Sequence, residues 1–319
     1  MSWTSHQING FNAWTGRTPA MEVTLLPELG TKMISLRNRL TGREWLAPAD
    51  GPLENRGYAS SFADSDGSGW DEMFPTVNVC RYPEHPWTGT ELPDHGEVWS
   101  IPWKVEAHGD RLSCSVHGVR MPYRLEKTYS FAAEDRLRID YLVTNLSPFP
   151  FSFLWAAHPL LRIREGMEII VPGELRQIAV SYSEGDRLGK RGDLRSWPQP
   201  FANRPECRLD RTGRREERTA EKFYFTGELP EGTASVYDPG KQEGITFTFP
   251  QEKVPYLSVW ANYGGYQGQY HLALEPATGF LDDLAHAMER EAAAIVEGGE
   301  TYAWHLEVGW MGTKKPVSP

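Results

Sequence analysis

Cysteine is scarce in this chain: Cys80, Cys114 and Cys207 are its three cysteines among 319 residues. An odd and sparse set cannot close a disulfide framework, and no two of them have the CxxC spacing of a zinc site. Positive charge is also in short supply, with 33 Lys and Arg against 43 Asp and Glu and a net charge of −10. This balance disfavours nucleic acid or an anionic membrane as the main partner, because both require a positive surface.

Long apolar runs are missing as well. No stretch of about 18 consecutive apolar residues occurs, so the sequence predicts no membrane-spanning helix. The first residues, MSWTSHQINGFNAW, lack both the basic and the apolar region of a secretory signal. Together with the sparse cysteines, this favours a reducing compartment, and we expect a cytoplasmic protein of undetermined oligomeric state.

What the chain does contain is alternation of apolar and polar residues with period two, the pattern of a half-buried strand. In RLRIDYLVTN (136–145), the residues Leu137, Ile139, Tyr141 and Val143 share one face, and TYAWHLEVGW (301–310) alternates in the same way. Similar patterns predict strands in RLSCSVHG (111–118), VTLL (23–26), TKMISLR (31–37), TASVYD (233–238) and GITFTF (244–249).

Helical patterning is limited to LDDLAHAMEREAA (281–293), where Leu281, Leu284, Ala285 and Met288 would line one face behind two early aspartates. Many antiparallel strands without intervening helices are typical of a large sandwich or barrel. We therefore expect an all-β protein in which residues 1–319 form a single domain. No internal repeat of about 40 residues indicates a propeller.

The familiar nucleophile and phosphate motifs are also missing: the chain has no GxSxG, no HExxH and no GxxxxGK[ST]. The glycine-rich stretch NYGGYQGQY (262–270) lies between strand-like segments and opens no helix, so it predicts a sharp turn. From Ser181 to Lys222 the chain becomes polar and rich in charges of both signs, which predicts a solvated excursion on the rim of the fold.

Two titratable residues stand in unusually apolar surroundings. His158 lies in FSFLWAAHPLL, where burial would lower its pKa and keep the imidazole neutral near pH 7. Such a histidine is either a satisfied core residue or a proton carrier at a cleft. Glu275 lies in YHLALEPATG, and a glutamate in a mostly apolar run is costly unless it is paired or used.

Acids and aromatic residues are neighbours at two further places. GSGWDEMFPTV sets Asp71 and Glu72 beside Trp70, and Trp260 in YLSVWANYGG offers a second aromatic platform. Sugar sites use aromatic rings to stack on the apolar face of a pyranose, while carboxylates accept hydrogen bonds from its hydroxyl groups. We expect Asp71, Glu72 and Trp260 to bind substrate. The alternative for Trp260 is a place in the core.

The stretch LPDHGEVW (92–99) holds His95 between two acids. Pro93 and Gly96 predict a bend there, with Val98 and Trp99 beginning a strand, and Asp94 or Glu97 could orient the imidazole ring. A metal site would need three or four convergent ligands, which His95, Glu97, His158 and Glu275 could supply only if the fold gathers them. No local ligand spacing supports a metal beyond the pair His95 and Glu97, so we expect none.

Five stretches in order, GWDEMFPTV, LPDHGEVWSIPW, FLWAAHPLL, LSVWANYGGYQGQYHLALEPATG and EGGETYAWHLEVG, resemble the aldose 1-epimerase (galactose mutarotase-like) family. The resemblance extends over roughly residues 20 to 310. It implies a single-domain antiparallel β-supersandwich that binds an aldose in an open cleft and needs no metal or organic cofactor. One departure is that GWDEMFPTV stands where typical galactose mutarotases carry an arginine-containing segment.

By motif position, the resemblance implies that Glu275 is the general base on the anomeric hydroxyl, His158 the general acid on the ring oxygen, and His95 a second histidine that holds the sugar. One carboxylate and one imidazole are what this chemistry requires near neutral pH, and they predict a bell-shaped pH profile. Two other readings remain: a glycosidase or lyase that pairs Glu275 with Asp71 or Glu72, and a non-catalytic carbohydrate-binding protein. The sugar is either neutral or phosphorylated, and the phosphorylated case would require arginines from the segment Arg204–Arg218 at the cleft.

Overall fold

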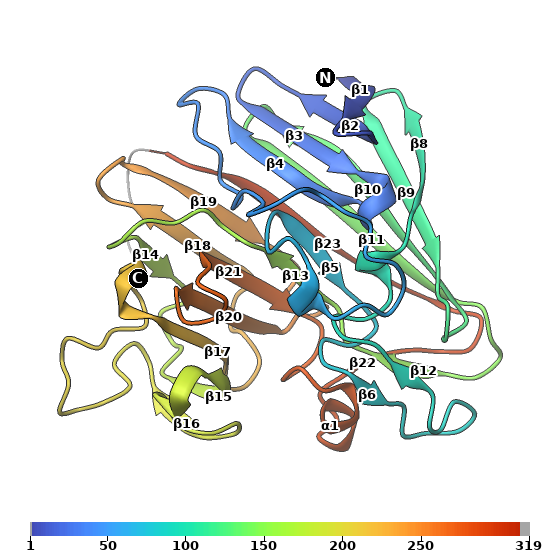
Figure 1. Ribbon diagram of the computed structural model, residues 1–319. Helices are drawn as coiled ribbons and strands as arrows, with labels where there is room; N and C mark the ends of the chain where they lie inside the picture. Colours follow the sequence, from blue (N-terminus) through green and yellow to red (C-terminus); the bar gives the residue numbers. More distant parts are fainter. Residues whose placement is uncertain (1, 313–319) are drawn as a thin grey trace.

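Two large antiparallel sheets make up most of the computed structural model, which describes residues 2–312 (Figure 1). The first sheet has eleven strands in the spatial order β1 (Ser2–Ile8), β2 (Phe11–Arg17), β3 (Met21–Leu26), β4 (Lys32–Asn38), β5 (Trp70–Met73), β13 (Ala156–Pro159), β21 (Tyr270–Ala277), β20 (Tyr256–Tyr263), β17 (Thr219–Phe225), β15 (Gln177–Ser183) and β16 (Leu194–Ser196).

The second sheet has eight strands in the order β14 (Glu168–Ile170), β18 (Thr233–Asp238), β19 (Glu243–Thr248), β23 (Thr301–Met311), β11 (Arg136–Asn145), β10 (Tyr123–Ala133), β9 (Arg111–His117) and β8 (Lys104–His108). Two short pairs complete the strands: β6 (Cys80–Arg81) with β7 (Glu91–Leu92), and β12 (Phe151–Phe153) with β22 (Ala294–Val296). The all-β, antiparallel class predicted from the sequence is confirmed.

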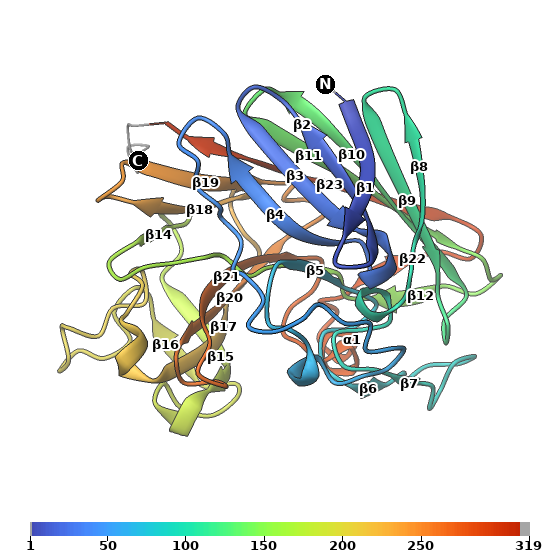
Figure 2. The ribbon, with the colours of Figure 1, turned by 45° about the horizontal axis from the view of Figure 1, so that its top comes forward.

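The core lies between the two sheets, as Figure 2 shows where β1–β4 cross over β10, β11 and β23. Strand β11 alternates between buried and partly exposed residues along its whole length, because one face packs inward. Aromatic rings bridge the layers: Trp3 of β1 stacks on Phe131 of β10, and Trp155 packs against Tyr141 and Trp304. Both sheets therefore contribute to one continuous hydrophobic cluster.

Every strand expected from alternation is present, including β11 and β23, whose bounds match the prediction almost to the residue. The expected helix is shorter than predicted: α1 spans Leu284–Glu289, and the Asp283 side chain caps it by accepting a hydrogen bond from the backbone N–H of His286. Leu284 is buried, whereas Met288 is only partly so. Within the described residues, no helix has the length and apolar character needed to cross a membrane.

The prediction that Val98 and Trp99 begin a strand is wrong. Residues Val98–Ser100 form a short 3-10 helix, η3, directly after the bend. Both His95 and Gly96 have positive φ angles, of 57° and 73°, so the backbone leaves the extended conformation here and pairs with Phe74 only through one isolated bridge. The bend itself is where the sequence placed it.

Candidate active site

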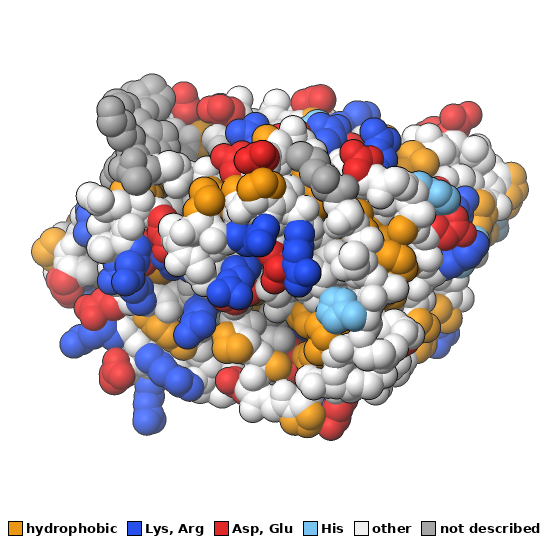
Figure 3. Space-filling view, turned by 90° about the horizontal axis from the view of Figure 1, so that it is seen from above, with side chains coloured by type: hydrophobic (Ala, Val, Ile, Leu, Met, Phe, Trp, Pro, Cys, Tyr) orange, Lys and Arg blue, Asp and Glu red, His pale blue; other side chains and the backbone are white. Residues whose placement is uncertain are grey.

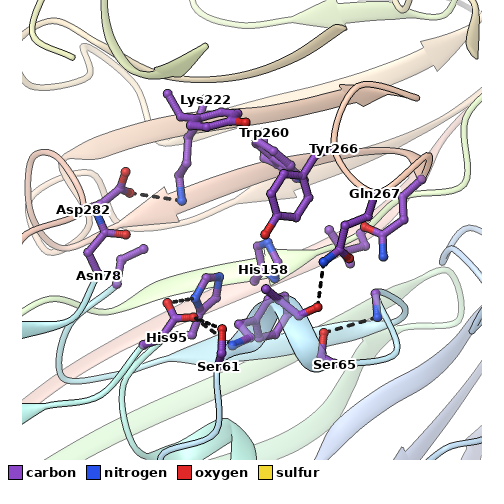
Figure 4. A pocket seen from close by; sticks show the side chains of 18 of the residues that line it. Ser61, Ser65, Asn78, His95, His158, Lys222, Trp260, Tyr266, Gln267 and Asp282 are labelled. Carbon is purple, nitrogen blue, oxygen red and sulfur yellow. Dashed lines mark hydrogen bonds and ion pairs between the residues drawn. The ribbon is translucent and has the colours of Figure 1, made fainter. Parts of the chain in front are cut away.

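A cavity of about 370 Å³ opens on one face of the eleven-stranded sheet (Figure 4). Strands β13, β15, β17, β20 and β21 supply its floor and one wall, and loops supply the rest. Three of these loops hold η2 (Phe62–Asp64), the bend at Asp94–His95, and the turn between β20 and β21, and further lining residues come from the segments after β5 and after β21. Gln267 in that turn donates a hydrogen bond to the carbonyl of Ala63, so two of the loops meet beside the cavity.

Strand register places a row of polar side chains across the sheet beneath this cavity. Asp71 of β5 is opposite His158 of β13, and the pairing of Ala156 with Ala277 sets His158 level with Glu275 of β21. Glu275 is opposite Ser258 of β20, which is in turn opposite Tyr224 of β17. Because side chains at one level of adjacent strands point to the same face, these residues are neighbours although they are far apart in sequence.

His158 and Glu275 face each other in this row. His158 Nε2 lies 3.7 Å from Glu275 Oε1, and both side chains are almost completely buried. His158 Nδ1 and Glu275 Oε1 have no hydrogen-bond partner among the described residues. Burial lowers the pKa of His158 well below its usual value of 6.5, and its neighbours His95 and Lys222 lower it further. His158 lines the cavity, whereas Glu275 lies directly behind His158 and Lys222.

Lys222 of β17 forms an ion pair with Glu275. Its Nζ lies 2.9 Å from Glu275 Oε2 and 3.1 Å from Asp282 Oδ1, and it lines the cavity together with Asp282. Burial alone would lower the pKa of Lys222, but the charges of Asp282 and Glu275 outweigh it and raise the pKa above its usual value. The lysine is therefore charged across the physiological range, and Figure 4 shows its side chain running toward Asp282.

His95 is fixed by its neighbour Asp94. His95 Nδ1 and Asp94 Oδ1 are 2.8 Å apart, and the ring stacks on Phe62 with a centroid distance of 4.0 Å. Burial would raise the pKa of Asp94, but the hydrogen bond and the charge of His95 hold it below its usual value. Glu97, the alternative partner, is instead buried and bonded to the hydroxyl groups of Tyr58 and Tyr123. His95 and His158 meet edge to face at 5.3 Å, so the structure brings both histidines to one place.

Aromatic rings form the opposite rim of the cavity. Trp260 lines it beside Tyr182 and Tyr266, with ring centroids 5.9 and 5.8 Å from the indole. The Trp260 indole N–H donates to Nε2 of His271, at 2.9 Å, which fixes the plane of the indole. Burial lowers the pKa of His271 to about 4. Trp260 is only partly buried, so part of its ring is open to the cavity.

Asp71 and Glu72 do not line this cavity. Asp71 lies below it, 3.1 Å from Lys32, and burial raises its pKa although Lys32 opposes that effect. Glu72 points to the other face of β5, where it accepts hydrogen bonds from Tyr141 and Trp155 within the core. Because successive residues of a strand point to opposite faces, the two acids could not both have faced a sugar. Neither side chain is therefore placed to contact a ligand in this cavity.

The arginines of the segment Arg204–Arg218 do not line the cavity either. Several are engaged elsewhere: Arg208 pairs with Asp210, Arg211 with Glu168, and Arg215 donates to the carbonyl of Gly268. On the face seen in Figure 3, Lys and Arg side chains lie among Asp and Glu side chains. Among the described residues that line the cavity, Lys222 is the one lysine or arginine, and two carboxylates already bind it.

Sequence reasoning missed several residues of the site. The sequence places Lys222 at the end of the polar segment from Ser181 to Lys222. It nevertheless stands in TAEKFYF, directly before an apolar run, much as Glu275 stands within one. Asp282 was read as part of a helix N-terminus, a role that Asp283 performs. Phe62 comes from a loop without any pattern, and Tyr266 comes from the glycine-rich turn, which by itself indicates no binding role. Within residues 2–312, no group of three or more His, Cys, Asp or Glu is placed so that it could hold a metal ion.

Several solved structures of other proteins share this fold. A galactose mutarotase-like protein from Lactobacillus casei is 16% identical with a TM-score of 0.67, over 93% of this chain and 99% of that one. A galactose mutarotase-like protein from Clostridium acetobutylicum is 13% identical with a TM-score of 0.69, over 98% and 99%. A galactose mutarotase related enzyme from Lactobacillus acidophilus is 14% identical with a TM-score of 0.66, over 95% and 98%. At such identities the likeness shows the fold.

The sequence itself matches none of the curated proteins. It does match the family model described as aldose 1-epimerase, over residues 81–309. This span includes the strands that carry His158, Lys222 and Glu275, and the bend that carries His95. The chain belongs to the aldose 1-epimerase family.

Proposed function

We propose that this protein is an aldose 1-epimerase that interconverts the α and β anomers of an aldose by acid/base ring opening. The observation that supports this most strongly is the facing pair formed by His158, which lines the cavity, and Glu275 directly behind it. Each has a buried polar atom without a hydrogen-bond partner among the described residues. Buried polar atoms are costly to leave unpaired, so a ligand that satisfies both would be favoured.

The reaction moves two protons across one sugar ring. Glu275 removes the proton from the anomeric hydroxyl O1 while His158 protonates the ring oxygen O5, so the bond from C1 to O5 breaks and an open aldehyde forms. Rotation about the bond between C1 and C2 and reclosure on the other face invert the anomer. Reclosure reverses the two proton transfers and returns both residues to their starting states.

For this cycle Glu275 must be ionised and His158 must carry the proton that it gives to O5. Burial and neighbouring groups lower the pKa of His158, so the imidazole is neutral in the empty cavity near pH 7 and takes up a proton when the sugar binds. Glu275 sits behind His158 and Lys222, and a sugar that slightly displaces the contact between His158 Nε2 and Glu275 Oε1 would reach Oε1. Catalytic hydrogen bonds are often long in the empty site and shorten when substrate binds.

The rest of the cavity suits an unphosphorylated sugar. Trp260 and Tyr266 provide apolar ring faces, while His95 and the turn that contains Gln267 offer hydrogen-bonding groups. Lys222 is the one lysine or arginine among its described lining residues and is bound by Glu275 and Asp282, so little positive charge is left for a phosphate. We therefore propose a neutral aldose as the substrate.

The experiment is polarimetry of freshly dissolved α-anomers across a panel of neutral aldoses and their 6-phosphates. Wild-type protein should accelerate the decay of optical rotation for a neutral aldose. Glu275→Gln and His158→Ala should each slow it by about 10²–10⁴-fold, the usual worth of general acid–base catalysis.

The matched control is His108→Ala, which removes an exposed histidine on β8 far from the cavity and should retain the wild-type rate. A rate that Glu275→Gln leaves unchanged would exclude this mechanism. Sugar-induced thermal stabilisation without any change in the decay of rotation would identify a non-catalytic carbohydrate-binding protein instead.

A further inference from the structure

We propose that Lys222 is a positioning residue for Glu275: it holds the carboxylate ionised and oriented so that Oε1 alone is left for proton transfer. This inference rests on the proposed function, because it assigns Lys222 a part in the same reaction. Lys222 itself would not exchange a proton with the sugar.

The two carboxylate oxygens of Glu275 have different contacts. Oε2 accepts a hydrogen bond from the Ser258 hydroxyl at 2.7 Å and lies 2.9 Å from Lys222 Nζ. Oε1 has no hydrogen-bond partner among the described residues and lies 3.7 Å from His158 Nε2. Two donors on one oxygen fix the plane of the carboxylate, so the other oxygen points at the acid partner.

Lys222 is itself held in place from the far side. Asp282 lies 3.1 Å from its Nζ and accepts hydrogen bonds from the hydroxyl groups of Tyr224 and Ser181. Asp282 is thereby occupied by three donors, which leaves it little capacity to bind a sugar hydroxyl. Its carbonyl also accepts from the backbone N–H of Asn78, which ties the loop to the segment that follows β5. Asp282, Lys222 and Glu275 thus form a fixed line of alternating charge, two members of which are visible in Figure 4.

The electrostatic need for this lysine follows from burial. Glu275 is completely buried, and a buried carboxylate charge is costly unless a nearby cation compensates it. The charged or titratable groups around it are His158 from β13, Lys222 and Tyr224 from β17, and Asp282 from the loop after β21. Asp282 is negative, Tyr224 is neutral because burial raises its pKa, and the low pKa of His158 keeps it neutral. Lys222 is then the cation that offsets the cost of burying this charge.

The test compares the pH dependence of epimerase activity in wild type and three variants at position 222. Lys222→Met removes the cation, so Glu275 takes up a proton at higher pH and the acid limb of the kcat profile moves up by about 1–3 pH units, the usual effect of one nearby charge. Lys222→Gln, which keeps hydrogen bonding without charge, should shift it in the same direction. Lys222→Arg should restore the wild-type limb.

The matched control is Lys127→Met, which removes a buried lysine paired with Glu72 on the other face of β5. It should lower the stability of the fold and leave the acid limb in place. An acid limb that stays at its wild-type pH in both folded neutral variants at position 222 would overturn the proposal.

A second readout does not depend on activity. Infrared difference spectra between each protein and its Glu275→Gln version isolate the carboxylate band of Glu275. We expect this band to disappear at higher pH in Lys222→Met than in wild type, and an unchanged pH would overturn the role of Lys222. Polarimetry of the wild type tests the epimerase activity separately, so failure of one proposal is distinguishable from failure of the other.

Discussion

At the scale of single residues, the site depends on polar groups that would be unfavourable in isolation. His271 is the clearest case, because it is buried behind Trp260 and its Nε2 accepts a hydrogen bond from the indole N–H. A proton on that nitrogen would remove the acceptor and place a charge in a dry setting. Burial accordingly lowers the pKa of His271 from 6.5 to about 4.

This lowered pKa predicts how stability changes with pH. The unfolded chain binds a proton at His271 below about pH 6.5, whereas the folded chain does so only near pH 4. The contribution is therefore fully present above pH 6.5 and is lost as pH falls, by up to about 3 kcal/mol. Urea titrations at pH 7 and pH 4 should show a smaller decrease in unfolding free energy for His271→Gln than for wild type. An equal decrease in both would contradict the prediction, and exposed His108→Gln should behave as wild type.

Residue patterns predicted part of the site and missed part of it for a physical reason. His158, Glu275 and Trp260 were identifiable because a polar or aromatic group in an apolar strand signals burial or use. Lys222 is hidden because it follows a stretch of exposed charge, and Asp282 is hidden because it stands beside the helix N-cap Asp283 and has the same side chain. Asp71 and Glu72 are buried acids as the pattern indicates, but the pattern does not tell whether a neighbouring lysine, tyrosine or sugar satisfies them.

At the scale of elements, strands supply the rigid floor and one bend supplies His95. The bend is pinned to the end of β5: His95 N–H donates to the carbonyl of Val77, and Glu97 N–H donates to the carbonyl of Phe74. Gly96 passes so close to Phe74 that an added Cβ would lie 2.0 Å from its backbone oxygen. Glycine at this position therefore serves both the positive φ and the close approach.

This geometry predicts a large effect of Gly96→Ala. Strain at a positive φ and the clash with Phe74 together should cost about 2–5 kcal/mol of unfolding free energy and displace His95. Gly89→Ala is the matched control, since Gly89 has a φ of 84° but open space around it, and only the strain of about 1–2 kcal/mol applies. Thermal or urea unfolding of the two variants measures the difference. Equal losses would show that the contact with Phe74 is not limiting.

The prediction of strands succeeded where the alternating pattern extended over many residues, and it failed after the bend. The alternation in β11 and β23 extends over enough residues to define both type and length. The bend at His95 was predictable from Pro93 and Gly96, but the 3-10 turn that follows it was not, because Val98 and Trp99 are buried by tertiary packing rather than by strand pairing.

At the scale of the whole molecule, sheet register assembles the site. β5, β13, β21, β20 and β17 lie side by side in the first sheet, although they come from widely separated parts of the chain. Which strands pair depends on the closure of the entire core, so the sequence could indicate an antiparallel all-β fold but not this order. That the chain forms a single domain stays a prediction, consistent with the hydrophobic cluster that both sheets share.

The central claim is that His158 and Glu275, brought level by that register, act as one acid–base pair. The most direct test is a double-mutant cycle on anomer exchange, measured by NMR exchange spectroscopy with the aldose that wild type turns over fastest. Residues that act in one step are strongly non-additive, so His158→Ala with Glu275→Gln together should be no slower than the slower single variant. Losses that multiply, or a Glu275→Gln variant as fast as wild type, would contradict the account.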